Sequence, residues 1–268
     1  MISPLASVHP NAQLGKDVTI DAFAVISDKV SIGDGTHIMS HVSILSNTAI
    51  GKNCTIFPGA VLGAIPQDLK FAGEETSVQI GDNTTIRECV TVNRGTKDKW
   101  KTVVGSHCLL MAYAHIAHDC IVGDHVILAN GVQLAGHVEV GDYAIIGGLC
   151  GVQQFTRIGK HAYIGGQSAI RKDVPPYVKA AREPISYMGI NVVGLHRRNF
   201  PHHQIEMISQ IYHLLFVGNH STTSGINLVK EKITDSDIKS EILQFIQGSK
   251  IGVIKRASKI DADEDSTF

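Results

Sequence analysis

The segment His115–Asp119, which reads HIAHD, places two imidazoles and a carboxylate within five residues. A neutral imidazole near pH 7 can take a proton from a hydroxyl group. A carboxylate beside it can orient the ring and stabilise its protonated form. His115 and His118 can instead form a zinc-binding pair, because neutral imidazoles are good zinc ligands. The segment therefore fits acid–base catalysis or metal binding, and simple solvation of its side chains is the third interpretation.

A six-residue hydrophobic repeat decides how these residues are arranged. Of the 29 positions at six-residue steps from Ile2 to Ile170, 26 carry Ile, Leu or Val. The exceptions are Asp68, Glu74 and Asp98. Neither a 3.6-residue helix nor simple strand alternation produces this spacing. The repeat predicts an all-β parallel β-helix built from hexapeptides.

Glycines recur eighteen residues apart, so three hexapeptides make one coil of a three-sided prism. Residues eighteen apart then lie about 4.8 Å from each other in adjacent coils. This places His137 beside Asp119, and Gln154 two coils from His118. None of these side chains occupies an inward position, so we expect them, with His115, to share one patch outside the coil. Asp119 can reach His118 only if the chain turns a corner between them.

Gly136 belongs to the same patch, one coil from His118. A glycine there lets its backbone N–H approach a developing oxyanion closely.

Packing or solvent accounts for most other reactive side chains. Four cysteines occupy small inward positions, where we expect them to pack: Cys54, Cys108, Cys120 and Cys150. Only Cys89 falls outside the pattern, and the odd count without CxxC pairs argues against disulfides. Four histidines are expected to be solvated: His9, His37, His161 and His220.

Breaks in the eighteen-residue spacing predict two external loops, at about 66–77 and 96–101. The repeat ends at Val174, before two prolines, and a composition rich in helix formers follows. We expect a β-helix domain over residues 1–190 and a C-terminal α-helical domain over 191–268.

Two helices are predicted in the C-terminal domain. Pro201 can open the first in its initial turn. Ser236 or Asp237 can cap the second, and the acidic segment 257–268 is expected to fray.

The charge balance excludes several partners. Lys plus Arg number 24 against 25 Asp plus Glu, so no overall basic field attracts nucleic acid or a membrane surface. No apolar run reaches membrane-spanning length, and the N-terminus lacks a signal-peptide pattern. A cytoplasmic location without stable membrane insertion is expected.

Seven motifs occur in order along the chain: PQDLKFAGE at 66–74, NRGT at 93–96, AHIAHDC at 114–120, LAGHV at 134–138, QQF at 153–155, DVPPYV at 173–178 and GINVVGLHRR at 189–198. Together with the hexapeptide repeat, they closely resemble the acyl-[acyl-carrier-protein]–UDP-N-acetylglucosamine O-acyltransferase family, which performs the first step of lipid A biosynthesis. The resemblance covers nearly the whole chain.

The resemblance implies left-handed coils and a homotrimer with active sites between neighbouring prisms. It implies transfer of a (3R)-hydroxyacyl group from acyl carrier protein to the 3-hydroxyl of UDP-N-acetylglucosamine. No metal is implied, and no cofactor beyond the phosphopantetheine of the carrier protein. In this scheme His118 is the general base, Asp119 orients it, and the Gly136 N–H stabilises the oxyanion.

The resemblance also implies the substrate contacts. The sugar-binding residues are Asp68, Lys70, His115 and His137. Gln154 contacts the nucleotide phosphates, while Asn191, Arg197 and Arg198 bind the nucleotide end or the pantetheine arm. Gly166 matches the position that sets acyl length. Plain alternatives are surface charges at a helix end for the two arginines, and an ordinary turn glycine for Gly166.

Two positions depart from the family pattern: Gln153 stands where many members have His, and Val193 where Glu is familiar. Each puts one substrate contact in doubt. A cluster of basic residues is a hypothetical docking patch for the carrier protein: Arg171, Lys172, Lys179 and Arg182.

Three alternatives remain. The first is the UDP-3-O-acylglucosamine N-acyltransferase of the same pathway, which carries an extra N-terminal domain. The second is a zinc-dependent carbonic anhydrase on the same fold, and the third a non-catalytic scaffold.

Overall fold

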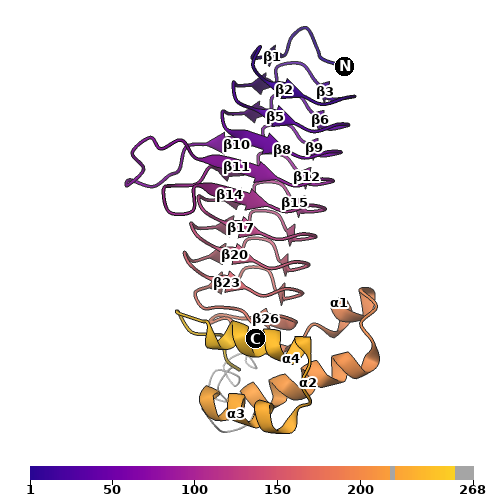
Figure 1. Cartoon of the computed structure of the whole chain (residues 1–268), viewed down its shortest axis with the longest axis vertical. Helices are drawn as coiled ribbons and strands as arrows, with labels where there is room; N and C mark the ends of the chain where they lie inside the picture. The colour runs from indigo at the N-terminus through magenta and orange to yellow at the C-terminus, as the bar shows by residue number, and fades with distance from the viewer. Residues whose placement is uncertain (218–220, 257–268) are drawn as a thin grey trace, which may run out of the picture.

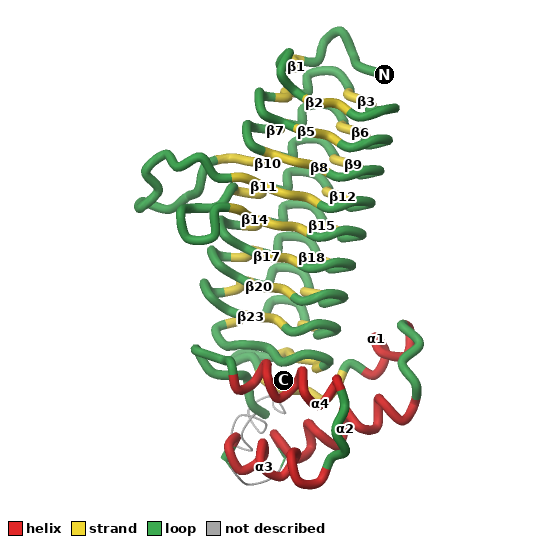
Figure 2. Tube along the Cα trace, in the orientation of Figure 1, coloured by secondary structure: helices red, strands yellow, loops and turns green. Residues whose placement is uncertain are grey.

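The computed structural model describes residues 1–217 and 221–256 of the chain. These form a tall prism of stacked coils, with helices packed at the C-terminal end (Figure 1). Each coil contributes one short strand to each of three sheets, and corners join the strands (Figure 2). The predicted hexapeptide β-helix with a helical C-terminal region is confirmed.

The first sheet carries the candidate site and has nine strands: β1 (Ser7–Val8), β4 (Val25–Ile26), β7 (Ser43–Ile44), β10 (Val61–Ala64), β13 (Thr91–Asn93), β16 (His115–Ile116), β19 (Gln133–Leu134), β22 (Gly151–Val152) and β25 (Ala169–Ile170). The second sheet has eight: β2 (Gln13–Leu14), β5 (Ser31–Ile32), β8 (Thr48–Ile50), β11 (Ser77–Ile80), β14 (Lys101–Val104), β17 (Ile121–Val122), β20 (Glu139–Val140) and β23 (Arg157–Ile158).

The third sheet has ten strands: β3 (Thr19–Ile20), β6 (His37–Ile38), β9 (Thr55–Ile56), β12 (Thr85–Ile86), β15 (Leu109–Leu110), β18 (Ile127–Leu128), β21 (Ile145–Ile146), β24 (Tyr163–Ile164), β26 (Val178–Ala181) and β27 (Ser186–Ile190). Strands within each sheet are parallel, apart from the antiparallel pair β26 and β27.

Stacked aliphatic side chains form the core of the prism. The repeated Ile, Leu or Val is the inward residue of each strand, as at Ile116, Leu134 and Val152, which are all buried. Their register confirms the eighteen-residue coil, because Ile116 pairs with Leu134 and Leu134 with Val152. β-Branched and aliphatic residues suit such pleated, one-sided burial.

The cysteines behave as predicted. Cys54, Cys108, Cys120 and Cys150 are free and buried, and Cys89 is exposed. Burial raises the pKa of the Cys108 thiol to about 11 and that of Cys120 to about 12, so these thiols stay protonated at neutral pH.

Both predicted loops are present. The first spans residues 65–76 between β10 and β11, and the second spans 94–100 between β13 and β14. They project from the same side of the prism (Figure 1).

Four helices follow the last strand among the described residues: α1 (Val192–Arg197), α2 (His202–Phe216), α3 (Thr222–Lys232) and α4 (Asp237–Gln247). Pro201 directly precedes α2, and the Ser236 side chain accepts a hydrogen bond from the Lys239 N–H at the start of α4, as predicted. The short α1 and the eleven-residue α3 were not predicted. The segment 257–268, expected to fray, lies outside the described residues.

Buried and partly buried polar contacts hold the helices against the last coils. Arg157 binds Asp173 Oδ2 at 2.9 Å and the Phe245 carbonyl at 2.8 Å. The Tyr212 hydroxyl donates to the Pro176 carbonyl at 2.6 Å. Across the described parts of the chain, no helix combines the length and apolarity needed to cross a bilayer.

Candidate active site

His118 and Asp119 lie at a corner of the prism, between β16 of the first sheet and β17 of the second. Asp119 has a left-handed backbone, with φ of 60°, so the chain turns sharply there. This turn brings Asp119 Oδ2 to 2.9 Å from His118 Nδ1. Adjacent side chains of an extended strand would point apart, so the corner makes the pair possible.

The pair is buried, although both side chains lie outside the coil as predicted. The second loop covers them: Asp119 Oδ1 accepts the Thr96 and Lys99 N–H groups at 2.9 and 3.2 Å. The Thr96 hydroxyl donates to Oδ2 at 2.7 Å. Asp119 is 0 % exposed and His118 5 % exposed, so the solvated interpretation is wrong for both.

The covering loop keeps Asp119 ionised. Burial raises the pKa of its carboxyl, but hydrogen bonds from Thr96, His118 and Lys99 outweigh this and hold the pKa below the usual value. Because an ionised carboxylate only accepts hydrogen bonds, the proton of neutral His118 resides on Nδ1. Nε2 is then free to accept a proton, and no described residue bonds to it.

His137 packs against the pair. Its ring meets the His118 ring edge-on with centroids 5.1 Å apart, and it stacks on Phe155 at 4.6 Å. His137 Nε2 lies 3.8 Å from Asp119 Oδ2. Its Nδ1 lies 3.1 Å from the Asp98 carboxylate, without the geometry of a hydrogen bond. Burial lowers the pKa of His137 despite the nearby carboxylates, which favours a neutral ring at pH 7.

Gly136 lies against the face of His118 where a reacting group must sit. A Cβ at this position would come within 2.5 Å of His118 Cε1 and 2.6 Å of Nε2, so only glycine fits without moving the ring. Within the described ranges, the Gly136 N–H has no acceptor. It is therefore available as a donor, on a residue that packs against the His118 ring.

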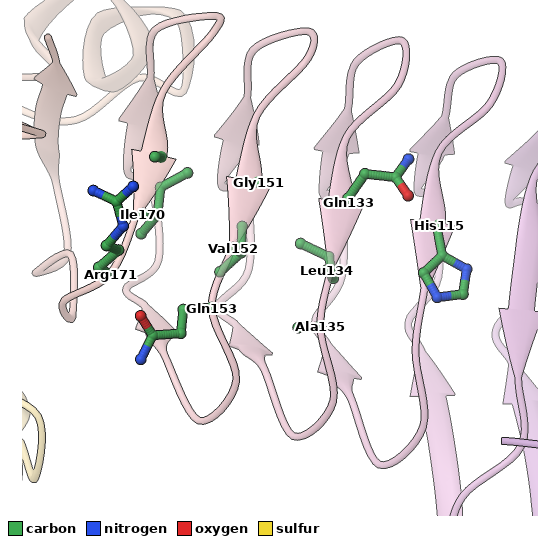
Figure 3. A pocket seen from close by; sticks show the side chains of 10 residues that line it. His115, Gln133, Leu134, Ala135, Gly151, Val152, Gln153, Ile170 and Arg171 are labelled. Atoms are coloured by element: carbon green, nitrogen blue, oxygen red, sulfur yellow. The ribbon is translucent and has the colours of Figure 1, made fainter. Parts of the chain in front are cut away.

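His115 stands on β16 at one end of a shallow depression over the first sheet, of about 400 Å³ (Figure 3). Its Nδ1 lies 2.7 Å from the Thr91 hydroxyl, and burial followed by the charge of His118 lowers its pKa. The depression crosses β19, β22 and β25 and ends at Arg171. At Gly151, in its floor, an added Cβ would meet nothing within 4 Å.

The structure places the other predicted residues farther along the chain surface. Gln154 is exposed beside Phe155, on the same edge as His118 and Gly136. Asp68 and Lys70 belong to the first loop, where Asp68 Oδ1 accepts the Lys70 N–H at 3.0 Å. In the described chain, neither residue forms a hydrogen bond or ion pair with His118 or Asp119.

The residues predicted to bind the nucleotide or pantetheine lie around α1. Asn191 caps this helix: its Oδ1 accepts the Gly194 N–H, and its Nδ2 donates to the His161 carbonyl. Arg198 ends α1, donates to the Gly194 carbonyl and lies over the Tyr143 ring. Arg197 is exposed.

Gly166 is exposed at the corner between β24 and β25, and it does not line the depression over the first sheet. Its Cβ would come within 3.1 Å of the Gly148 carbonyl oxygen.

The prediction that His161 is solvated is wrong. This side chain is 6 % exposed and stacks between Tyr143 and Tyr177, with centroids 4.9 and 5.5 Å away. Burial lowers its pKa to about 4. His9 is exposed, while His37 is partly buried and pairs with Asp21 at 2.9 Å. His220 lies outside the described residues.

Sequence reasoning missed Thr96, Lys99 and Asp98 as neighbours of the pair. All three belong to the loop that breaks the repeat. The break itself was a signal, because the inserted residues join β14, which pairs with β17 directly after Asp119.

Comparisons with known proteins identify the family of this chain. A family model described as "Udp N-acetylglucosamine O-acyltransferase; Domain 2" matches residues 173–254, and a bacterial transferase hexapeptide model matches 29–64 and 101–136. The acyl-[acyl-carrier-protein]–UDP-N-acetylglucosamine O-acyltransferase of Thermodesulfovibrio yellowstonii is 44 % identical over 256 residues, which covers 95 % of this chain and 99 % of the relative. The chain belongs to that family.

Further relatives of this O-acyltransferase family extend the match. The one from Chlorobaculum parvum is 50 % identical over 252 residues, covering 94 % of this chain and 96 % of the relative. The crystal structure of the Bacteroides fragilis UDP-N-acetylglucosamine acyltransferase superposes with a TM-score of 0.94 at 45 % identity, covering 95 % of this chain and all of the other. These matches confirm the predicted family, the left-handed β-helix and the enzyme class.

Proposed function

We propose that this chain transfers a (3R)-hydroxyacyl group from acyl carrier protein to the 3-hydroxyl of UDP-N-acetylglucosamine, with His118 as general base. O-acyl transfer from this carrier to this nucleotide sugar is the activity named for its relatives, and in lipid A biosynthesis it is the reaction of the family to which the chain belongs. The observation that carries the catalytic assignment is the buried His118–Asp119 pair beside Gly136.

The geometry supports a complete proton cycle. His118 Nε2 takes the proton of the sugar hydroxyl while the hydroxyl oxygen attacks the thioester carbonyl. Asp119 stabilises the imidazolium through the 2.9 Å bond to Nδ1, and the Gly136 N–H donates to the tetrahedral oxyanion. Collapse of the intermediate breaks the C–S bond, and His118 returns the proton to the leaving thiolate.

The depression over the first sheet suits the acyl chain. It begins at His115, which lies on β16 three residues before His118. Its floor is made of small and aliphatic residues such as Ala135, Gly151 and Ala169. From β16 to β25 it crosses three coil spacings, about 14 Å. Neutral His115 and His137 are placed to hold the sugar at its catalytic end.

A homotrimer accounts for the scattered substrate residues. Asp68, Lys70, Asn191, Arg197 and Arg198 form no hydrogen bond or ion pair with His118 or Asp119 within one described chain. In the proposed trimer, a neighbouring chain brings such residues to the site. A row of outward aliphatic residues supports such packing. Leu109, Ile127 and Ile145 are in register on the third sheet and partly exposed.

A metal-dependent alternative rests on one observation: ligand atoms of His118, Asp119 and His137 all lie within 4.8 Å of one another. Both carboxylate oxygens of Asp119 already accept hydrogen bonds, and His118 Nδ1 is bonded to one of them. A metal would have to displace these bonds, which favours the general-base assignment. The absence of a metal and the cytoplasmic location stay predictions.

One assay tests the proposal and its rivals together. Purified protein is given hydroxyacyl carrier proteins of increasing chain length with either UDP-N-acetylglucosamine or UDP-3-O-acylglucosamine. We expect ester formation on the first acceptor only, unchanged by a chelator. Activity only on the second acceptor identifies an N-acyltransferase, and loss of activity with chelator, restored by zinc, supports the metal-dependent alternative.

A further inference from the structure

We propose that Thr96, in the loop that breaks the repeat, is a positioning residue for the His118–Asp119 pair. The inference rests on the proposed function, because it concerns the same catalytic site. Thr96 forms a hydrogen bond with each oxygen of the Asp119 carboxylate: its N–H donates to Oδ1 at 2.9 Å and its hydroxyl donates to Oδ2 at 2.7 Å.

The direction of the hydroxyl bond is set by its neighbours. The Asp98 N–H donates to Thr96 Oγ1 at 3.3 Å, so this oxygen accepts from Asp98 and donates its own hydrogen to Asp119. Thr96 is 8 % exposed and Asp119 is 0 % exposed, so little room remains for water to replace a lost donor. A buried carboxylate oxygen that loses its donor is costly.

Positioning matters because two imidazoles face the same oxygen. Asp119 Oδ2 accepts from His118 Nδ1 at 2.9 Å and lies 3.8 Å from His137 Nε2. A carboxylate that can rotate about its Cβ–Cγ bond can turn from one ring toward the other. With Thr96 bonded to both oxygens, the carboxylate plane is fixed and Oδ2 stays aligned with His118.

Among the described residues, this contact has no counterpart elsewhere in the coil, which distinguishes it from the packing at the other corners. Thr102 also touches Asp119, since its hydroxyl accepts the Asp119 N–H at 2.9 Å. Threonines at the same inward position of other coils also accept from the coil above, since Thr36 accepts the Cys54 N–H and Thr84 the Cys108 N–H, one residue later in the coil than Asp119. The Thr96 hydroxyl instead belongs to the inserted loop, and it donates to the Asp119 side chain rather than accepting from a backbone N–H.

A double-mutant cycle tests the inference on the full-length protein. Thr96→Val removes the hydroxyl and keeps the shape and the backbone donor, while Thr96→Ser keeps the hydroxyl. Both are made alone and combined with Asp119→Ala, and kcat is measured with saturating acyl carrier protein and UDP-N-acetylglucosamine. Lys97→Ala, an exposed change in the same loop, is the matched control. Thermal melting checks the fold, and Thr96→Ala replaces Thr96→Val in the cycle if the latter does not fold.

We expect Thr96→Val to lower kcat about 10- to 100-fold, the range for a bond to a charged group, and Thr96→Ser to stay within about threefold of the parent. In the Asp119→Ala background, Thr96→Val should cost less than about twofold, because the residue acts through Asp119. Equal losses in both backgrounds, no loss at all, or no rescue by serine would each overturn the inference. His118→Ala in the same assay separates the two claims: if it retains activity, the general-base assignment in the proposed function fails, whereas a parent without transferase activity would refute the proposed function itself.

Discussion

At the scale of single residues, the site depends on one left-handed corner. The φ of 60° at Asp119 turns its carboxylate back toward His118, where β16 would otherwise separate the two side chains. A left-handed backbone is uncommon for residues other than glycine, although Asp tolerates it better than most. The coil turns its corners repeatedly in this way, so the scaffold supplies the strained conformation that catalysis uses.

Gly136 is predicted to be irreplaceable for a steric reason. The Cβ of alanine would stand 2.6 Å from His118 Nε2, so the ring must move from its place beside the attacking hydroxyl. We expect Gly136→Ala to lower kcat on the order of 10²-fold, with an unchanged melting temperature. Steady-state kinetics and thermal melting measure the two effects. If Gly136→Ala kept the parental kcat, the fit of Gly136 against His118 would not be required for catalysis.

At the scale of elements, a column of stacked rings joins the coils to α1. It follows the corner between the second and third sheets: His107, His125, Tyr143, His161 and Tyr177. Arg198, at the end of α1, lies over the Tyr143 ring, and Phe200 meets His161 edge-on. Burial within this column lowers the pKa of the His161 ring to about 4.

His161 should make stability fall in acid. Its folded-state pKa of about 4 lies below the ordinary value of about 6.5, so the unfolded chain binds a proton that the folded chain does not. The folded state is therefore fully favoured above pH 6.5 and loses up to about 1.4 kcal/mol per pH unit as the pH falls toward 4. We expect His161→Phe, which keeps the stacking, to flatten the fall in melting temperature over this window. A fall as steep as that of the parent would refute this origin.

The depression over the first sheet gives a second prediction at this scale. Because a Cβ at Gly151 meets nothing within 4 Å, a larger side chain can enter the depression without straining the coil. We expect Gly151→Leu to raise the KM for long-chain acyl carrier protein at least tenfold, since it fills space that the acyl chain needs. The KM for UDP-N-acetylglucosamine and the melting temperature should not change. If Gly151→Leu left the KM at the parental value for every acyl chain length, the acyl group would have to bind elsewhere.

The repeating elements and the places where loops interrupt them could be predicted from sequence, but the contacts that these loops make with the coil could not. Register along the coil follows from side-chain period alone, which is why His137 was correctly placed beside Asp119 and Gly136 beside His118. The burial of Asp119 by Thr96 and Lys99 has no periodic signal, because an inserted loop folds over the coil by specific hydrogen bonds. The prediction that His161 is solvated was wrong for a related reason. Its burial depends on α1 and Phe200, which come from the non-repeating region.

At the scale of the whole molecule, the proposed trimer should depend on the outward aliphatic row of the third sheet. An aspartate at Ile127 would lie unpaired in a desolvated interface, which is costly. We expect Ile127→Asp to convert the trimer to monomer in sedimentation equilibrium and to lower activity with it. The control is Ile121→Asp, at an outward position of the second sheet that is 41 % exposed. A trimer that survives Ile127→Asp unchanged would place the interface on another face.

The most direct test of the account is the turnover of His118→Ala, because every catalytic step is routed through this ring. The matched control is His37→Ala, which removes a histidine that pairs with an aspartate at the same 2.9 Å on the prism surface, away from the loops. With acyl carrier protein donor and UDP-N-acetylglucosamine, the account predicts a loss of about 10²- to 10⁴-fold in kcat for His118→Ala. It predicts parental turnover for His37→Ala. A loss smaller than about tenfold at His118, in a protein that still folds and assembles, would contradict the assignment of this residue as the general base.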